Sequence, residues 1–349
     1  MESRFNAGRI SSDGGALLLR EVAEKMDLFG RLAGRFTDYR DPDRREHEVE
    51  ELLAQRVFGL ALGYEDLNDH EELRSDPLWA TLAGKTEPDG TSRARDRDRG
   101  RPLAGKSTLN RLEWAPLAAD QTGRYHKVTV DPAGIEELLT DLALEEMDPP
   151  EEPIVLDLDA THDPLHGKQE GRFFHGYYDC YCYLPLYIFW GEELLVAKLR
   201  RSNIDPSAGS LPEIERLVEA IRARWPEAEI ILRADSGFAR ERIMAWCEAR
   251  DVDYLFGLAR NQRLRRMIEP LLETVRAEAE EAGQPMRHFA ELRYRTLDSW
   301  SRERRVVAKA EHIPGKSNPR FVVSSLSAEA WPGKALYEEL YCARGEMEN

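Results

Sequence analysis

The chain has 349 residues, of which 42% are hydrophobic, enough for two or three domains with ordinary cores. No stretch approaches the roughly 20 apolar residues of a membrane span, and the polar start lacks a signal peptide's apolar core, so we expect a cytoplasmic protein without a membrane partner. The net charge of −16 argues against a surface coated with phosphate-binding groups, because Lys and Arg supply most nonspecific affinity for nucleic acid. Any such contact is expected to be local.

Cysteines and arginines limit the ligands further. Cys180, Cys182, Cys247 and Cys342 show neither a CxxC pair nor a zinc-like histidine spacing, and we expect reduced thiols. Each arginine-rich segment, taken alone, is more often a solvated face than a binding site. The three segments contain Arg93, Arg95, Arg97, Arg99 and Arg101; Arg260, Arg263, Arg265 and Arg266; and Arg302, Arg304 and Arg305.

The amino-terminal part is predicted to be helical. Over residues 14–83 apolar side chains recur at helical spacing, with a second strong run over 49–62. The first run places Leu17, Leu18, Val22, Met26 and Leu28 on one apolar face. This half of the chain is therefore expected to be rich in α-helix.

Polar segments divide the chain in two. Residues 85–101 lack any periodicity that could bury a face, so we predict a loop or a disordered basic arm near 85–105. A helix is expected over 107–114. The acidic, proline-containing segment 141–153 predicts a boundary between a helical region, 1–145, and a second domain, 151–349.

The second domain changes to strand patterns, which begin as an antiparallel meander. Its strands are predicted over 154–159, 173–182, 184–190 and 194–199, with Gly191-Glu192 as a hairpin turn. A crossover pattern follows: helix 211–225, strand 229–234, helix 240–250 and strand 254–258. A charged helix near 263–281, strands near 288–297, 304–311 and 320–325, and a helix from about Pro332 complete the chain.

This order predicts an α/β fold with a ribonuclease-H-like core of mixed sheet, interrupted by a β-rich insertion near 260–331. In such a core the first and fourth strands are parallel neighbours, so residues at their carboxyl ends meet. Asp159 and Asp235 stand at these two ends. The last helix would add Tyr341, Arg344 and Glu348 from one face, spaced Tyr-x2-Arg-x3-Glu.

Three clustered acids repel one another and call for divalent cations. Mg²⁺, with Mn²⁺ as the alternative, suits Asp159, Asp235 and Glu348 as hard oxygen ligands, and the pattern predicts two-metal phosphodiester chemistry. The competing interpretation is that both aspartates simply begin turns. Alternation also points Asp157 to the face of Asp159; we prefer Asp159 because it lies at the strand exit.

Two other features bear on ligands. His162 and His166 are candidates to bind substrate, although a loop histidine is usually just solvated. Gly100–Ser107 matches the P-loop pattern, but the preceding arginines and aspartates cannot form the buried strand that a P-loop needs. We therefore expect no bound nucleotide and no ATPase.

Together these residues resemble the DDE transposases of bacterial insertion sequences, in the branch named for its Tyr-Arg-Glu-Lys signature, and most of all its thirteen-eighty group. The resemblance covers nearly the whole chain, and its four ordered motifs are specific together. They are Ser11-Ser-Asp-Gly-Gly-Ala-Leu-Leu-Leu-Arg20, Leu158-Asp159-Ala-Thr161-His-Asp-Pro-Leu-His-Gly167, Arg233-Ala-Asp235-Ser-Gly-Phe238 and Tyr341-x2-Arg344-x3-Glu348.

The resemblance implies that Asp159, Asp235 and Glu348 form the catalytic, metal-binding triad, and that Tyr341 and Arg344 contact DNA near the cut phosphate. It implies magnesium-dependent cleavage of double-stranded DNA at the element's inverted repeats and strand transfer into target DNA. The helical region would bind the repeats, and a homodimer would pair them in a synaptic complex. Such a protein would associate with the nucleoid in the cytoplasm.

One feature departs from the family pattern. The signature lysine should follow Glu348, but the sequence reaches its last residue at Asn349. We therefore expect a carboxy-terminally truncated transposase with an incomplete last helix. Two other functions stay open: an inactive chain that only binds the inverted repeats, and a ribonuclease-H-like nuclease that cuts without joining.

Overall fold

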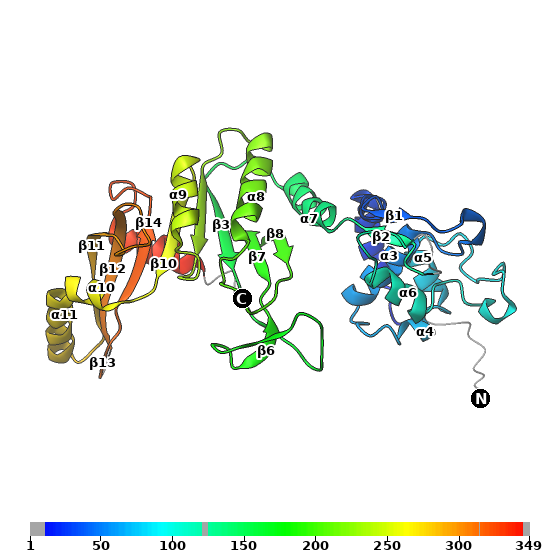
Figure 1. Ribbon diagram of the computed structural model, residues 1–349, viewed down its shortest axis with the longest axis horizontal. Helices are drawn as coiled ribbons and strands as arrows, with labels where there is room; N and C mark the ends of the chain where they lie inside the picture. The colour runs from blue at the N-terminus through cyan, green and yellow to red at the C-terminus, as the bar shows by residue number, and fades with distance from the viewer. Residues whose placement is uncertain (1–10, 121–124, 314, 345–349) are drawn as a thin grey trace, which may run out of the picture. The chain divides into compact units, whose positions relative to one another are not determined.

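The protein consists of two compact units, residues 1–138 and 139–349, each with a hydrophobic core of its own (Figure 1). The computed structural model describes residues 11–120, 125–313 and 315–344. The division falls within helix α7 (Pro132–Glu146), shortly before the boundary that the acidic segment predicts.

Helices dominate the first unit, as predicted for residues 14–83. A two-stranded antiparallel sheet of β1 and β2 accompanies them. In chain order the elements are α1 (Ala16–Lys25), α2 (Leu28–Ala33), β1 (Phe36–Asp38), η1 (Pro42–Arg44), α3 (Val49–Ala61), α4 (His70–Leu73), α5 (Pro77–Leu82), η2 (Asp96–Asp98), α6 (Lys106–Glu113) and β2 (Val128–Val130). Trp79 and Leu109 are fully buried, so α5 and α6 both supply core side chains.

Helix α1 turns its predicted apolar face to solvent. Leu17, Leu18 and Val22 are 45%, 70% and 53% exposed, whereas Ala16 and Ala23 are buried. The two alanines are seven positions apart and share a face, which lets the helix backbone lie close to the core. The prediction that the leucines form the inner face is therefore wrong.

Asp13 fixes the start of α1. Its carboxylate accepts hydrogen bonds from the indole of Trp79 at 2.9 Å and from the hydroxyl of Tyr64 at 3.2 Å. Because these donors belong to α5 and to the turn after α3, the bonds fix the entry of the chain into the helix.

Residues 85–105 form a loop that contains the short helix η2. Arg93 in this loop has a side chain only 10% exposed, pairs with Glu46 at 2.6 Å and contacts the ring of His47 at 2.8 Å. Asp98 pairs with the guanidinium of Arg74 at 3.3 Å. Part of the first arginine-rich segment therefore ties the loop to its own unit.

The segment Gly100–Ser107 lacks the surroundings of a phosphate-binding loop. It follows η2 rather than a strand. The amide of Lys106 donates to the carboxylate of Glu71 at 2.9 Å, and its ammonium group donates to Asn68 at 2.7 Å. A carboxylate thus lies where a phosphate would have to bind.

A mixed sheet of nine strands organises the second unit. Its order is β11-β12-β14-β10-β9-β3-β7-β8, with β13 paired to β12. The elements are β3 (Ile154–Asp159), β4 (Asp163–Pro164), β5 (Phe173–His175), β6 (Cys180–Tyr183), β7 (Leu186–Trp190), β8 (Glu193–Lys198), α8 (Ser210–Arg224), β9 (Ile230–Ala234), α9 (Glu241–Ala249), β10 (Asp253–Leu258), α10 (Gln262–Met267), α11 (Glu269–Ala282), β11 (Met286–Tyr294), β12 (Arg304–Ile313), β13 (Lys316–Ser317), β14 (Arg320–Ser324), α12 (Gly333–Ala335) and η3 (Leu336–Tyr341). The pairs β3–β9 and β9–β10 are parallel, and the strands predicted as an insertion extend the same sheet.

Helices cover both faces of this sheet. Helices α8 and α9 bury Leu217 and Ile243 against one face, together with Leu232 of β9. Figure 1 shows these two helices beside β3 and β7. Leu336 and Leu340 of η3 pack on the opposite face.

In the ranges that the structure describes, no helix has the length and apolar content of a membrane span.

Two predicted elements of the second unit differ from the observed ones. The strand predicted over 173–182 is a hairpin of β5 and β6, which pairs with β4 in a separate three-stranded sheet. Asp179, with φ of 53°, makes the turn between them. The single charged helix predicted near 263–281 is two helices, because Pro270 lies in the first turn of α11 and starts a new helix there.

Two of the three arginines in the third arginine-rich segment are buried, so the interpretation of this segment as a solvated face is wrong for them. Arg304 and Arg305 are 3% and 8% exposed. Arg304 pairs with Glu241 of α9 at 2.6 Å, and Arg305 pairs with Glu291 of β11 at 2.6 Å. Both lie on β12, an interior strand of the sheet, where a charge is retained only with a partner.

All four cysteines are free thiols. Cys182 and Cys247 are buried. Burial raises the pKa of the Cys247 thiol far above its ordinary value, so this side chain acts as a packing residue rather than a nucleophile.

Candidate active site

The two predicted strand-end aspartates lie on adjacent parallel strands in matching register. Asp157 is opposite Arg233 and Leu158 is opposite Ala234 in the pairing of β3 with β9. One residue further along both strands, Asp159 stands beside Asp235. Neighbouring strands are about 4.8 Å apart, so the sheet brings the two carboxylates together at its carboxyl edge.

The structure separates the roles of Asp157 and Asp159. Asp157 is 2% exposed, and both of its oxygens accept hydrogen bonds of 2.6 Å from the guanidinium of Arg233. Burial raises the pKa of Asp157, and the bonds from Arg233 oppose this shift. The side chain of Asp159, by contrast, is 25% exposed. Asp159 is thus the acid of this strand that a ligand can reach.

Backbone contacts orient Asp235. Its Oδ1 accepts a hydrogen bond of 2.8 Å from the amide of Gly237. A Cβ on Gly237 would lie 2.9 Å from the same oxygen, so the close approach requires glycine here. The sequence Asp235-Ser-Gly237 therefore fixes one carboxylate oxygen and leaves the other for a ligand.

Arg233 also shapes the carboxy-terminal helix. Its Nη1 donates to the carbonyl of Leu340 at 2.6 Å. In an α-helix this carbonyl would accept the amide of Arg344. The structure instead has a π-helix, η3, followed by a 3-10 turn over 342–344. The regular helix expected here is not observed, and Arg233, a motif residue for which the sequence predicted no role of its own, holds the segment over the site.

Tyr341 and Arg344 both reach the acidic pair. Nη1 of Arg344 lies 3.9 Å from Oδ1 of Asp159. Burial raises the pKa of Tyr341; Arg344 lowers it and Asp235 raises it further, so its hydroxyl stays protonated. Glu348, the third predicted acid, lies outside the described residues.

A glycine of β10 admits the Tyr341 hydroxyl. A Cβ on Gly257 would lie 2.5 Å from the Tyr341 oxygen and 2.9 Å from the amide nitrogen of Ser236. Nothing in the sequence pattern marks Gly257, because only the packing of η3 on the sheet brings Tyr341 to this strand.

An aromatic cluster at the three-stranded sheet of β4, β5 and β6 was not predicted from the sequence. The ring of Tyr178 stacks on His162 at a centroid distance of 4.1 Å and contacts His175 at 4.8 Å. Burial raises the pKa of Tyr178, and so do the charges of Asp159 and Asp235. His162 is therefore held in a ring stack next to the acids rather than simply solvated.

The donor set fits part of a divalent metal site. Asp159 and Asp235 supply hard carboxylate oxygens, which Mg²⁺ prefers. Within residues 11–120, 125–313 and 315–344, no group of three His, Cys, Asp or Glu side chains is placed to hold a metal ion. Two of the three predicted ligands thus come together in the described structure.

Comparisons with known proteins identify the family of the chain. The family described as Transposase DDE domain group 1 matches residues 1–349. The chain belongs to this family, which confirms the resemblance to DDE transposases.

Other comparisons add less. Among curated proteins, none matches the chain. One similar solved structure is the cryo-EM structure of a piggyBac transposase synaptic complex with hairpin DNA, at a TM-score of 0.41 and 10% identity. The similarity covers 95% of this chain and 66% of that one, so the chain spans slightly less than two thirds of the piggyBac chain.

Proposed function

We propose that this chain is a transposase that cleaves double-stranded DNA at the ends of its element and joins the freed ends to target DNA, with Mg²⁺ or Mn²⁺ as cofactor. The observation that carries the proposal is the pair Asp159 and Asp235, register-matched at the ends of adjacent parallel strands in a member of a DDE transposase family. The Tyr-Arg-Glu-Lys branch and the thirteen-eighty group are the finer assignment that we propose.

The catalytic unit is proposed to be a ribonuclease-H-like core. The order β8-β7-β3-β9-β10 supports this, with β3, β9 and β10 parallel and β7 and β8 antiparallel. The hairpin β11–β12 and strand β14 would then be the β-rich insertion, continuing the same sheet beyond β10.

Asp159 and Asp235, joined by Glu348, are the proposed metal ligands. These carboxylates would hold divalent ions, which when bound would lower the pKa of a coordinated water and stabilise developing negative charge on phosphate oxygens. Arg344, 3.9 Å from Asp159, reduces the repulsion between the acids in the absence of metal.

The residues of the closing helix would bind the DNA near the cut phosphate. Tyr341 keeps its proton, because burial raises its pKa, and its hydroxyl donates a hydrogen bond to a phosphate oxygen. The guanidinium of Arg344 matches the geometry of a phosphate group. Arg233 acts indirectly as a positioning residue, through its bond to the Leu340 carbonyl.

The first unit is proposed to bind the inverted repeats, and two copies of the chain would pair the element's ends in a synaptic complex. Each unit would have its own role: residues 1–138 would recognise the repeats, and residues 139–349 would carry out the phosphodiester chemistry. We assign the protein to the cytoplasm, in association with the nucleoid.

The test is Mg²⁺-dependent nicking and joining of a labelled duplex that carries the terminal repeat of the element encoding this chain. Asp235→Asn removes a carboxylate charge with little change of shape. We expect cleavage to fall by about 10³-fold, because several kcal/mol of transition-state stabilisation depend on the metal. Asp298→Asn, an exposed acid in the loop between β11 and β12, is the matched control and should cut like the wild type.

Three other outcomes contradict the proposal in distinct ways. Binding of the repeat without cutting under either metal ion indicates an end-binding protein that represses transposition. Cutting without joining indicates a nuclease of the ribonuclease-H-like class. Unimpaired cutting by Asp235→Asn shows that the acidic pair is not the catalytic centre.

A further inference from the structure

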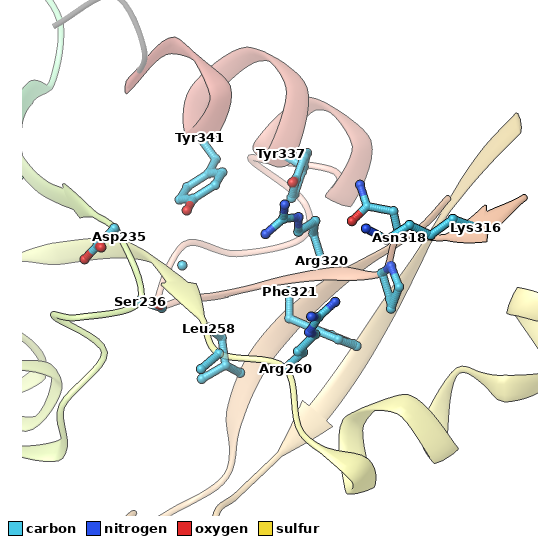
Figure 2. Close-up of a pocket in the computed structure, with 13 residues that line it drawn as sticks. Asp235, Ser236, Leu258, Arg260, Lys316, Asn318, Arg320, Phe321, Tyr337 and Tyr341 are labelled. Atoms are coloured by element: carbon cyan, nitrogen blue, oxygen red, sulfur yellow. The ribbon is translucent and has the colours of Figure 1, made fainter. Parts of the chain in front are cut away.

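A basic cavity adjoins the acidic pair. Its volume is about 700 Å³, and it is lined by Asp235 and Tyr341 together with Arg260, Lys316 and Arg320. Figure 2 shows Asp235 and Tyr341 at one end, Lys316 at the other, and Arg260 and Arg320 between them. The cavity therefore continues the site along the sheet, on the side away from Asp159.

The pairing of β10 with β14 assembles this cavity. Leu258 is opposite Phe321 in this antiparallel pair. The same register carried past the end of β10 places Arg320 next to the loop that bears Arg260. Lys316 comes from β13, the short strand paired with the end of β12. Residues distant in sequence thus form one basic wall.

The charges of this wall are unbalanced. Arg260, Lys316 and Arg320 are exposed, and within the part of the chain that the structure describes none of them has a carboxylate within 4.0 Å. The chain has 65 acidic against 49 basic residues, so three cations gathered without partners are unusual here. Such a group attracts an anion.

The position of the cavity indicates which anion. Two strand spacings, from β9 across β10 to β14, span about 10 Å. One DNA strand carries a phosphate every 3.4 Å or so along the helix axis, and because the strand winds around this axis its successive phosphates lie farther apart than the rise, so about two successive phosphates fit this distance. The guanidinium of an arginine donates two hydrogen bonds to one phosphate group, and the ammonium group of Lys316 adds a further positive charge.

We propose that this cavity holds the backbone of the DNA strand next to the phosphate that Asp159 and Asp235 attack, with Arg260 and Arg320 on successive phosphates. This inference rests on the proposed function for its substrate. It adds a strand-holding subsite that directs one continuous strand from the acidic pair across β10 and β14.

The test compares two double variants that remove equal charge. Arg260→Gln/Arg320→Gln removes the two arginines of the cavity wall and leaves Lys316, and Arg242→Gln/Arg276→Gln removes two exposed arginines of α9 and α11. The probe is a fluorescein-labelled thymidine oligonucleotide, single-stranded, whose binding is followed by anisotropy in EDTA from about 50 to 300 mM salt. All four side chains are exposed, so both variants should keep the wild-type unfolding midpoint.

We expect the cavity variant to lose about tenfold in affinity, and the slope of log K against log salt to become shallower by about 1.4, or 0.7 per phosphate contact. The control variant should keep the wild-type slope. Equal losses in the two variants would reduce the effect to general charge and overturn the proposal. Displacement of the oligonucleotide by millimolar inorganic phosphate would overturn it as well, since it would show a simple anion site.

The binding assay separates this inference from the proposed function, because no cleavage is needed in EDTA. With Mg²⁺, the cavity variant should cut the element-end duplex more slowly, while Asp235→Asn should bind the oligonucleotide normally and not cut. If the cavity variant binds and cuts like the wild type, the subsite is wrong and the transposase proposal stands. If Asp235→Asn cuts but the cavity variant still loses binding, the transposase proposal fails and the strand-binding subsite stands.

Discussion

Two groups of arginines in the second unit look alike in the sequence and differ in the structure. Arg304 and Arg305 on β12 are buried; Arg304 is bound to Glu241 and Glu248 of α9, and Arg305 to Glu291 of β11. Arg260 and Arg320, at the edge of β10 and β14, are exposed and line a cavity beside Asp235. The first pair stabilises the fold, and the second is available to a ligand.

The difference comes from position in the sheet rather than from local composition. An interior strand can retain a charge only if acids reach it from adjacent elements. The ends of β10 and β14 lie at the edge where the acidic pair opens to solvent, and no acid other than Asp235 lines the cavity there. Whether a cluster of arginines stabilises the fold or binds a ligand therefore depends on whether acids reach it from adjacent elements of the sheet.

The largest expected effect is the loss of the buried ion pairs. Arg304→Met leaves Glu241 and Glu248 without their shared cation, and we expect the free energy of unfolding to fall by about 3 kcal/mol. Urea unfolding measures this. A loss below about 1 kcal/mol would mean that the pairs contribute no more than surface pairs do and would remove the contrast with the cavity arginines.

A second, smaller effect concerns the shape of the site. Gly257→Ala places a methyl group 2.5 Å from the hydroxyl of Tyr341, so the tyrosine must move. We expect a stability loss of about 1–3 kcal/mol, typical of overpacking, and slower cleavage of the element-end duplex. Tyr341→Phe in the Gly257→Ala background should recover part of the stability, because it removes the clashing oxygen. Full activity of Gly257→Ala would show that the position of Tyr341 is unimportant.

The contribution of Arg304 should also depend on pH. Burial raises the pKa of Glu241 and of Glu248, but the hydrogen bonds and charge of Arg304, together with hydrogen bonds from Ser301 to Glu241 and from Arg302 and Tyr254 to Glu248, lower both pKa values below their ordinary range. A depressed folded pKa gives stability that is present above the unfolded pKa, about 4.3, and lost as the pH falls through the folded value. The destabilisation by Arg304→Met should thus be full at neutral pH and shrink in acid. A constant difference in urea midpoint down to pH 3 or so would contradict this assignment.

The smallest effects are expected at exposed arginines. Arg302 reaches Glu248 at 2.8 Å with a side chain 60% exposed, and Arg302→Ala should cost less than about 1 kcal/mol. Arg260→Ala should change stability by less than about 0.5 kcal/mol, because the side chain touches no acid. Urea unfolding of both variants beside Arg304→Met gives the comparison directly. A large loss for Arg260→Ala would make it a structural residue.

The strands that carry the acids could be predicted from the amino-acid sequence. Hydrophobic runs bounded by turn residues predict β3 and β9, and a period of two puts Asp157 and Asp159 on one face. The observed strands Ile154–Asp159 and Ile230–Ala234 agree with these predictions, and their parallel pairing is as expected. These features depend on the order of apolar, polar and turn residues within a single segment, so they can be predicted without knowing its neighbours.

The partners of these side chains depend on how distant segments pack together. The bidentate bond of Arg233 to Asp157, the approach of Tyr341 to Gly257 and the joining of Arg260 with Arg320 each link segments far apart in the chain. Local patterns could not distinguish the buried arginines of β12 from the exposed ones of the cavity, nor the buried alanines of α1 from its exposed leucines. The physical reason is that burial and pairing depend on which surfaces meet when strands and helices pack, and periodicity within one segment does not specify its neighbour.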